Sequence, residues 1–239
     1  MPEFAAIVLS AGRGSRMRSD IPKQYMDLLG KPVIYYSLKA FQDSPVSEIV
    51  LVTSEADREY CRREIVEKYA LTKVKAIVSG GAERYDSVLE GLRAIQGADY
   101  VLIHDGARPM LDQEIVARSI ETVISEKACV VGMPVKDTIK VINDQGYAAN
   151  TPDRRYLWMV QTPQSFEYRL IREAYEQMRS DMLSGKDMPA ITDDAMVAEY
   201  EAGISVKLIP GSYENIKITT PEDLEIAALH LHHRAEEKV

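Results

Sequence analysis

The chain has 239 residues, 46% of them hydrophobic, with 29 Lys and Arg against 37 Asp and Glu, which gives a formal net charge of -8. This length and composition suit a globular protein with a continuous core, and they exclude long disordered or collagen-like segments. The acidic balance is the wrong sign for a dedicated binder of nucleic acid or of an anionic membrane, so we expect neither partner.

The beginning of the chain predicts a cytoplasmic protein. Met1 leads directly into the apolar alternation of Phe4–Leu9, without a basic leader, and no segment approaches the length of a membrane span. The two cysteines, Cys61 and Cys129, lie far apart in the sequence, which fits a reduced compartment better than a disulfide framework.

Apolar runs alternate with amphipathic stretches along the chain. We predict buried strands at Phe4–Leu9, Ile49–Thr53, Val74–Ser79, Tyr100–His104 and Ala128–Met133, because these runs are short and rich in Val, Ile and Leu. We predict helices at Val33–Gln42, Ala56–Lys68, Ser87–Ile95, Asp112–Glu126, Tyr168–Met182, Asp193–Ala202 and Pro221–His233. This alternation is typical of an α/β fold, a mostly parallel sheet with helices on both faces, in which ligands bind at the carboxyl ends of the strands.

The regular pattern is interrupted between residues 137 and 158. Thr138–Ile142 and Tyr147–Ala149 flank the turn-forming sequence Asn143-Asp144-Gln145-Gly146, which predicts a β-hairpin projecting from the α/β body. A two-stranded hairpin is marginally stable alone, so we expect it to pack on something, and a second subunit is a natural candidate.

The first predicted strand ends in a turn of small residues, Ser10–Met17, whose glycines allow the backbone to approach a phosphate closely. The turn lacks the Gly-Lys-Ser/Thr of a Walker A loop and the third glycine of a dinucleotide fingerprint. A strand-to-helix turn without a ligand is therefore one interpretation. The cations Arg13, Arg16, Arg18 and Lys23 favour another, a phosphate-rich ligand such as a nucleoside triphosphate, bound mainly by Arg16 and Lys23.

A second group of charges follows the fourth predicted strand, at His104-Asp105-Gly106-Ala107-Arg108-Pro109. Since this strand ends at the same edge of the sheet as the first, Asp105 and Arg108 are predicted to lie near the first loop. Asp105 could accept hydrogen bonds from ribose hydroxyls and Arg108 could hold an anion, whereas the simpler alternative is that the two side chains pair or cap a turn.

Two further segments are candidates. Gly80–Ser87 follows a strand and enters a helix, so its backbone and the Ser87 hydroxyl could contact a base, or Asp86 or Ser87 could simply cap the helix. Lys217, between Ile216 and Ile218, is a candidate cation, or only an exposed lysine of an edge strand. The cysteines and histidines have no metal-ligand spacing, so we predict no metal site made by the protein itself, and no nucleophilic triad is evident.

Taken together, these segments resemble the 2-C-methyl-D-erythritol 4-phosphate cytidylyltransferase family. The matching segments occur in order along nearly the whole chain: Ala11–Met17, Pro22–Tyr25, Gly80-Gly81 through Ser87-Val88, His104–Pro109, Pro134–Thr138, Asp153-Arg154 with Leu157-Trp158, Gln161–Gln164, Thr192–Ala195 and Asn215–Lys217. The resemblance implies a single Rossmann-like nucleotidyltransferase domain over residues 1–239, with residues 137–158 inserted as a β-hairpin dimerisation arm.

The resemblance also implies a reaction and its residues. A phosphate oxygen of methylerythritol phosphate attacks the α-phosphorus of CTP and pyrophosphate leaves, so positioning and charge stabilisation dominate catalysis. The implied catalytic cations are Arg16, Lys23, Arg154 and Lys217. The implied CTP contacts are Ala11, Gly12, Gly14, Gly81, Ser87 and Asp105, and the implied acceptor contacts are Asp105, Arg108, Thr138, Thr162 and Thr192.

The same resemblance implies a metal ion and an oligomeric state. Magnesium is expected, held mainly by the phosphates of CTP. A homodimer is expected as well, in which the arm lends Thr138 and Arg154 to the neighbouring active site.

Three other functions compete with this interpretation. Ribitol-5-phosphate cytidylyltransferase shares the fold and CTP, but the Leu157-Trp158 pair and Ala107 before Arg108 favour methylerythritol phosphate as the acceptor. A nucleotide-binding protein without activity is expected to have lost its catalytic cations, which are present here. A glycosyltransferase of similar fold is expected to carry an Asp-x-Asp pair where Asp105 stands alone.

Overall fold

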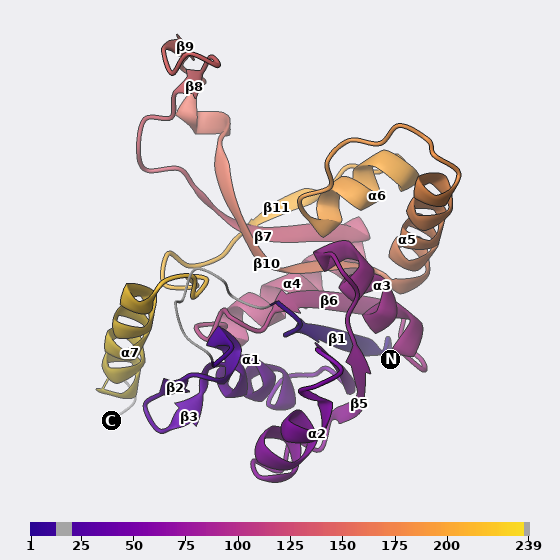
Figure 1. Ribbon diagram of the computed structural model, residues 1–239, viewed down its shortest axis with the longest axis vertical. Coiled ribbons are helices and arrows are strands. Elements are labelled where there is room, and N and C mark those ends of the chain that lie inside the picture. The colour runs from indigo at the N-terminus through magenta and orange to yellow at the C-terminus, as the bar shows by residue number, and fades with distance from the viewer. Residues whose placement is uncertain (13–20, 237–239) are drawn as a thin grey trace.

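A central β-sheet organises the computed structural model, which describes residues 1–12 and 21–236 (Figure 1). Within those residues the sheet has seven strands in the order β11-β7-β10-β6-β1-β4-β5. Their bounds are β1 Phe4–Leu9, β4 Glu48–Thr53, β5 Val74–Ser79, β6 Tyr100–Asp105, β7 Ala128–Pro134, β10 Trp158–Glu167 and β11 Lys207–Pro210. Only β10 runs antiparallel to its neighbours β6 and β7, and the other pairs are parallel. The prediction of a mostly parallel sheet is therefore confirmed.

Helices cover both faces of this sheet, as expected for an α/β fold (Figure 1). Their bounds are α1 Val33–Gln42, α2 Arg58–Tyr60, α3 Arg84–Ala94, α4 Gln113–Glu126, α5 Tyr168–Leu183, α6 Asp194–Ala202 and α7 Pro221–Glu236, and α2 continues as a π-helical segment, Cys61–Glu67. These helices agree closely with the seven predicted from the sequence. No helix in the described part of the chain is both long and apolar enough to cross a membrane.

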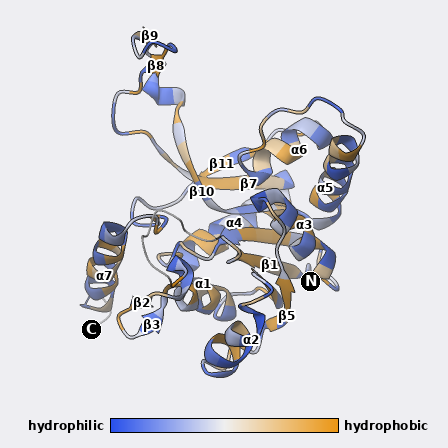
Figure 2. Cartoon of the chain, in the orientation of Figure 1, coloured by the Kyte–Doolittle hydropathy of each residue, from blue (hydrophilic) through white to orange (hydrophobic). Residues whose placement is uncertain are grey.

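The alternation of side chains along β1 divides the core into two layers. Ala6 and Val8 pack with α1 and α4 on one face, and Ala5 and Ile7 pack with α3, α5 and α6 on the other. Because successive side chains of a strand point to opposite faces, a strand of six apolar residues requires cover on both sides. Figure 2 shows the consequence, since the central strands are coloured mainly as hydrophobic and the outer surfaces of the helices as hydrophilic.

Two strands of the sheet were not predicted, and one predicted strand is absent. β10 contains Pro163 and several polar residues, and β11 is only four residues long, so neither has the apolar run on which our strand prediction depended. Conversely, we expected a short strand around Asn215–Ile218, but this segment joins no sheet. It is held instead by hydrogen bonds to other segments. The Ile218 N–H donates to the carbonyl of Ala107 at 2.8 Å, and Lys23 Nζ donates to the carbonyl of Ile218 at 2.7 Å.

Between β7 and β10 the chain leaves the α/β body and projects away from it (Figure 1). In this segment β8, Val141–Ile142, pairs antiparallel with β9, Ala148–Asn150, so the paired region is shorter than the expected hairpin. The turn between them places Gly146 at a φ of +83°, a conformation that glycine adopts at little cost. A short helical turn, Arg154–Tyr156, leads back to β10.

A small additional layer covers the edge of the body near the C-terminus. β2, Asp27–Leu28, pairs antiparallel with β3, Lys31–Pro32. Leu28 and Val33 from this region pack with Ile218 and with Ala227 of α7. This cluster holds the segment that carries Lys217 against the body, where it reaches the ends of the central strands.

Candidate active site

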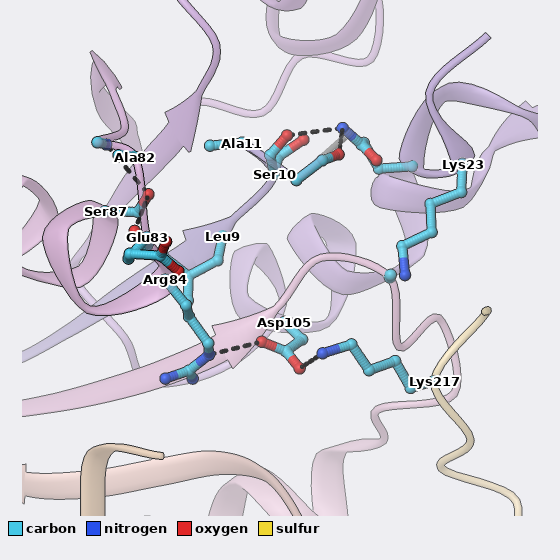
Figure 3. Close-up of a pocket in the computed structure, with 14 residues that line it drawn as sticks. Leu9, Ser10, Ala11, Lys23, Ala82, Glu83, Arg84, Ser87, Asp105 and Lys217 are labelled. Atoms are coloured by element: carbon cyan, nitrogen blue, oxygen red, sulfur yellow. Dashed lines mark hydrogen bonds and ion pairs between the residues drawn. The ribbon is translucent and has the colours of Figure 1, made fainter. Parts of the chain in front are cut away.

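One cavity lies at the carboxyl ends of β1, β5 and β6, where ligands bind in open α/β sheets (Figure 3). Seven of the residues that the sequence singled out line it, namely Ala11, Gly12, Lys23, Gly81, Ser87, Asp105 and Lys217. The lining also includes Leu9, Ser10, Gln24, Ala82, Glu83, Arg84 and Ala107. The fold therefore brings together five separate segments of the chain at this edge of the sheet.

Asp105 ends β6 and is the most strongly paired carboxylate of the cavity. Its Oδ2 lies 2.7 Å from Lys217 Nζ and its Oδ1 lies 3.4 Å from Arg84 Nε, so the two cations reach it from opposite sides (Figure 3). Burial acts to raise the pKa of Asp105, but Arg84, Lys217 and Arg108 together hold this pKa far below its ordinary value. Asp105 is consequently a fixed negative charge among cations and does not serve as a proton donor near neutral pH.

The side of the cavity opposite Lys217 is formed by a glycine pair and the start of α3. The Gly81 N–H donates to Ser87 Oγ at 3.2 Å, and the Ser87 hydroxyl donates to the carbonyl of Glu83 at the same distance. Glu83 and Asp86 form a reciprocal capping box, so Asp86 takes part in capping the helix as one alternative suggested, while Ser87 instead bridges the loop. A Cβ at Gly80 would lie 2.5 Å from Ser87 Oγ, which explains why glycine is required there.

The residues directly after β1, Ser10 to Gly12, are held by the buried side chain of Gln24. Its Nε2 donates to the carbonyls of Ser10 and Gly12, at 2.7 and 3.2 Å. Next to it, Lys23 Nζ donates to the carbonyl of Ile218 at 2.7 Å, so this lysine contacts the segment that carries Lys217. Lys23 and Lys217, which are distant in sequence, thus both line the cavity.

Behind Asp105, a chain of hydrogen bonds fixes the end of β6. The Asp105 N–H donates to Thr162 Oγ1 at 3.1 Å, and Thr162 Oγ1 lies 2.9 Å from Nδ1 of the buried His104. His104 Nε2 lies 3.2 Å from the Arg108 carbonyl. Burial lowers the pKa of His104 to about 4, so its ring is neutral at physiological pH.

Arg108 lies beside the same carboxylate but does not form a close ion pair with it. Its Nε is 4.0 Å from Asp105 Oδ2, while its Nη1 donates to the carbonyl of Asn215 at 2.7 Å. Burial lowers the pKa of Arg108, against the attraction of Asp105. The alternative of a simple Asp105–Arg108 pair therefore does not describe the site, because Lys217 is the closer partner. Arg108 Nε is buried without a hydrogen-bond partner.

The remaining predicted residues lie away from the cavity lining or outside the residues that the structure describes. Thr138 and Arg154 are exposed on the projecting segment, and Arg154 Nη1 donates to the Lys136 carbonyl at 3.1 Å. Thr192 is exposed just before α6. Arg16 and Gly14 lie outside the described residues. Thus the structure brings the described nucleotide-side candidates together within one chain, while Thr138 and Arg154 are not part of the cavity lining.

Sequence reasoning assigned no role to Arg84, Gln24 or Asp194. Arg84 lines the cavity and makes two short contacts with the fully buried Asp194, at 2.7 and 2.8 Å. All three residues lie inside segments that carried the family resemblance. Their residue type could have identified them, because a charged or amide side chain that is buried needs a hydrogen-bonding partner.

The described residues form no preformed metal centre beside these charges. Among the described residues, no group of three or more His, Cys, Asp or Glu side chains could hold a metal ion. The two carboxylates in the cavity lining are already engaged, Asp105 with Lys217 and Glu83 in the capping box of α3. The described residues therefore do not supply a complete set of ligands for a cation.

Comparisons with known proteins agree with this geometry. Residues 4–233 match the model of the family described as 2-C-methyl-D-erythritol 4-phosphate cytidylyltransferase. A protein of that name from Lachnospira eligens is 52% identical over 227 residues, which cover 95% of this chain and 98% of the relative. A relative of the same name from Lachnoclostridium phytofermentans is 48% identical and is covered to 95%.

Solved structures give the same result. The crystal structure of 4-diphosphocytidyl-2C-methyl-D-erythritol synthase from Anaerococcus prevotii superposes with a TM-score of 0.82 at 33% identity, over 97% of this chain and 96% of that one. The 2-C-methyl-D-erythritol 4-phosphate cytidylyltransferase of Thermus thermophilus gives a TM-score of 0.76 at 28% identity, over 95% and 98% of the two chains. The structural similarity therefore extends over nearly the whole chain.

Proposed function

The chain belongs to the 2-C-methyl-D-erythritol 4-phosphate cytidylyltransferase family, and we propose that the cavity around Asp105 is where it carries out the reaction of that family. The enzyme transfers a cytidylyl group from CTP to 2-C-methyl-D-erythritol 4-phosphate in the non-mevalonate route to isoprenoids. The observation that carries the proposal is the meeting of Lys23, Lys217 and Asp105 with the Gly81 loop in one cavity at the ends of the strands.

In the proposed mechanism a phosphate oxygen of the acceptor attacks the α-phosphorus of CTP. The new P–O bond forms as the bond from the α-phosphorus to the bridging oxygen breaks, and pyrophosphate leaves with the bonding electrons. Negative charge increases on the transferred and departing oxygens, so ammonium and guanidinium groups held in place beforehand lower the barrier. We assign this stabilisation to Lys23 and Arg16, and the positioning of the attacking phosphate to Lys217 and Arg154.

The other side chains bind the two substrates. Ala11, Gly12, Gly14, Gly81 and Ser87 would surround the nucleotide, and Asp105 would accept hydrogen bonds from hydroxyl groups of the ribose and of the acceptor. Arg108, Thr138, Thr162 and Thr192 would line the acceptor side. The ionised state of Asp105 supports its role, because a carboxylate accepts two strong hydrogen bonds from hydroxyls.

We further propose that Mg²⁺ reaches the site bound mainly to the phosphates of CTP. Phosphate oxygens are among the ligands that Mg²⁺ takes in enzymes that act on nucleotides. Such an ion neutralises part of the triphosphate charge. The chain's own contribution is then its cations, chiefly Lys23 and Lys217, rather than a set of metal ligands.

The projecting segment is proposed to be a dimerisation arm of a cytoplasmic homodimer, inserted at residues 137–158 in a domain spanning residues 1–239. Its apolar side chains are exposed in the single chain: Ile142 is 63% exposed, Tyr147 70% and Tyr156 79%. Exposed apolar groups on a thin projecting hairpin favour a protein partner. A second copy would bring Thr138 and Arg154 to the cavity of the neighbouring subunit.

The first experiment measures pyrophosphate release from CTP and Mg²⁺ with methylerythritol phosphate, with ribitol 5-phosphate, or with no acceptor. The proposal expects release that depends on methylerythritol phosphate. A preference for ribitol phosphate would leave the fold and the phosphate chemistry intact but refute the assignment of the acceptor residues. If neither acceptor causes pyrophosphate release, the result would favour nucleotide binding without catalysis.

A second experiment tests the shared active sites by mixing inactive Lys23→Ala and Arg154→Ala subunits. If each site takes Lys23 from one chain and Arg154 from its partner, half of the randomly mixed dimers contain both subunits, and each of these has one intact site out of two. Activity should then recover to about a quarter of the wild-type value. If Arg154 acts within its own chain, both sites of every mixed dimer carry a substitution, and activity stays at the level of the single variants.

A further inference from the structure

A buried ion pair connects the cavity to the start of α6. Arg84, at the first position of α3, donates from Nη1 and Nη2 to the two carboxylate oxygens of Asp194, at 2.7 and 2.8 Å. The same guanidinium directs Nε toward Asp105 Oδ1, at 3.4 Å. We propose that Arg84 is a positioning residue that joins Asp105 to the start of α6, and that Asp194 and Tyr175 fix its orientation.

The surroundings of Asp194 explain why the guanidinium can take only one position. Asp194 is fully buried, and Tyr175 of α5 donates its hydroxyl to Asp194 Oδ1 at 2.6 Å. A buried carboxylate needs such partners, because each unpaired oxygen would lose its hydration without compensation. The Nη1 and Nη2 atoms of Arg84 are thus held by Asp194 in the core, while Nε faces Asp105 in the cavity. The Arg84 side chain is 30% exposed.

Two further hydrogen bonds, made by the neighbours of Asp194 in the sequence, hold the start of α6. The N-cap residue Asp193 accepts the Met196 N–H at 3.0 Å, and Gln164 of β10 accepts the Ala195 N–H at 2.9 Å. Thr192, which our proposed function places at the acceptor, comes immediately before this N-cap. A shift of Asp194 would therefore move Thr192 as well as Arg84.

The arrangement has a feature that stability alone does not explain. On the outer surface, α3 is also joined to α5, by a bidentate pair in which Arg93 donates to both oxygens of Glu176, at 2.8 and 2.6 Å. A buried pair is seldom more stabilising than well-packed apolar residues of similar size. Burying Arg84 and Asp194 at the cavity, rather than two apolar side chains, has its clearest use in orienting Asp105 toward the acceptor.

The test compares Asp194→Asn and Tyr175→Phe with the control variant Glu176→Gln, which weakens the surface pair between α3 and α5. Asparagine keeps the volume of aspartate but cannot offer two anionic oxygens, so the guanidinium should turn toward Asp105. This inference rests on the proposed function, and it expects the acceptor KM to rise about tenfold in Asp194→Asn. The CTP KM should rise by a clearly smaller factor, because Asp105 contacts both substrates in the proposed function whereas Thr192 contacts the acceptor alone. Tyr175→Phe should give a smaller rise in the same constant, and Glu176→Gln should give none.

Hydrogen exchange supplies a readout that does not depend on the reaction. The amides of Ala195 and Met196 should exchange faster in Asp194→Asn and Tyr175→Phe than in wild type, and at the wild-type rate in Glu176→Gln. Equal rises in both KM values, or unchanged kinetics in both variants, would overturn the inference. If Asp194→Asn does not fold, Tyr175→Phe decides. If the wild-type enzyme releases no pyrophosphate with methylerythritol phosphate, the proposed function is wrong. The exchange rates then still show whether these residues hold the start of α6.

Discussion

The buried histidine behind Asp105 gives a prediction about acid stability. His104 packs edge-on against Phe41, with ring centroids 5.6 Å apart, and its two nitrogens face Thr162 and the Arg108 carbonyl. Since a carbonyl only accepts, Nε2 must carry the proton and Nδ1 must accept from the Thr162 hydroxyl. Protonation of Nδ1 would require Thr162 Oγ1 to accept from the imidazolium while it also accepts the Asp105 N–H.

The expected size of the effect follows from the pKa of His104. Burial lowers this pKa from 6.5 to about 4, so below pH 6.5 the unfolded chain binds a proton that the folded chain does not. The stabilisation is therefore complete above pH 6.5 and is lost as the pH falls toward 4. Between pH 7 and pH 5 this linkage lowers the free energy of unfolding by about 2 kcal/mol. Asp105 adds little in this interval, because the lowering of its pKa matters near and below its ordinary value of 3.8.

The assay is urea unfolding at pH 7 and pH 5 for the wild type and for His104→Gln, which keeps an N–H for the Arg108 carbonyl but does not titrate. The wild type should lose about 2 kcal/mol more than the variant over this interval. His232→Gln, at an exposed position of α7, controls for the loss of one histidine and should behave as the wild type does. Equal losses in the wild type and His104→Gln would refute the reasoning that His104 is buried in its neutral form.

Two further predictions concern the cavity itself. Gly80→Ala places a Cβ 2.5 Å from Ser87 Oγ, so the loop must shift. We expect a higher CTP KM together with a loss of about 1–3 kcal/mol in unfolding free energy. As a control, Gly97→Ala places a Cβ that meets no atom within 4 Å and should leave the CTP KM unchanged. Lys217→Ala removes the 2.7 Å ion pair to Asp105 and should lower turnover about a hundredfold in the pyrophosphate assay. Near-normal turnover of Lys217→Ala would contradict the positioning role proposed for this lysine.

The fold class and most of the helices and strands could be predicted from the amino-acid sequence alone. β1, β5 and α1 have the bounds that the sequence predicted, because a run of apolar residues can be buried in only a few ways. It also indicated that Asp105 and the first loop lie at one edge of the sheet, since parallel strands end on the same side. Lys23 and Lys217 were identified by their residue type within recognisable segments.

The pairing of polar residues, in contrast, became visible only in the three-dimensional structure. β10 escaped prediction because its polar side chains find partners in the core, as Thr162 does with His104, and no local pattern reveals such a partner. For the same reason Arg84 received no role, since its partner Asp194 lies 110 positions away. Apolar burial follows from local periodicity, but the pairing of buried charges depends on which distant segments meet, and here that pairing shapes the cavity.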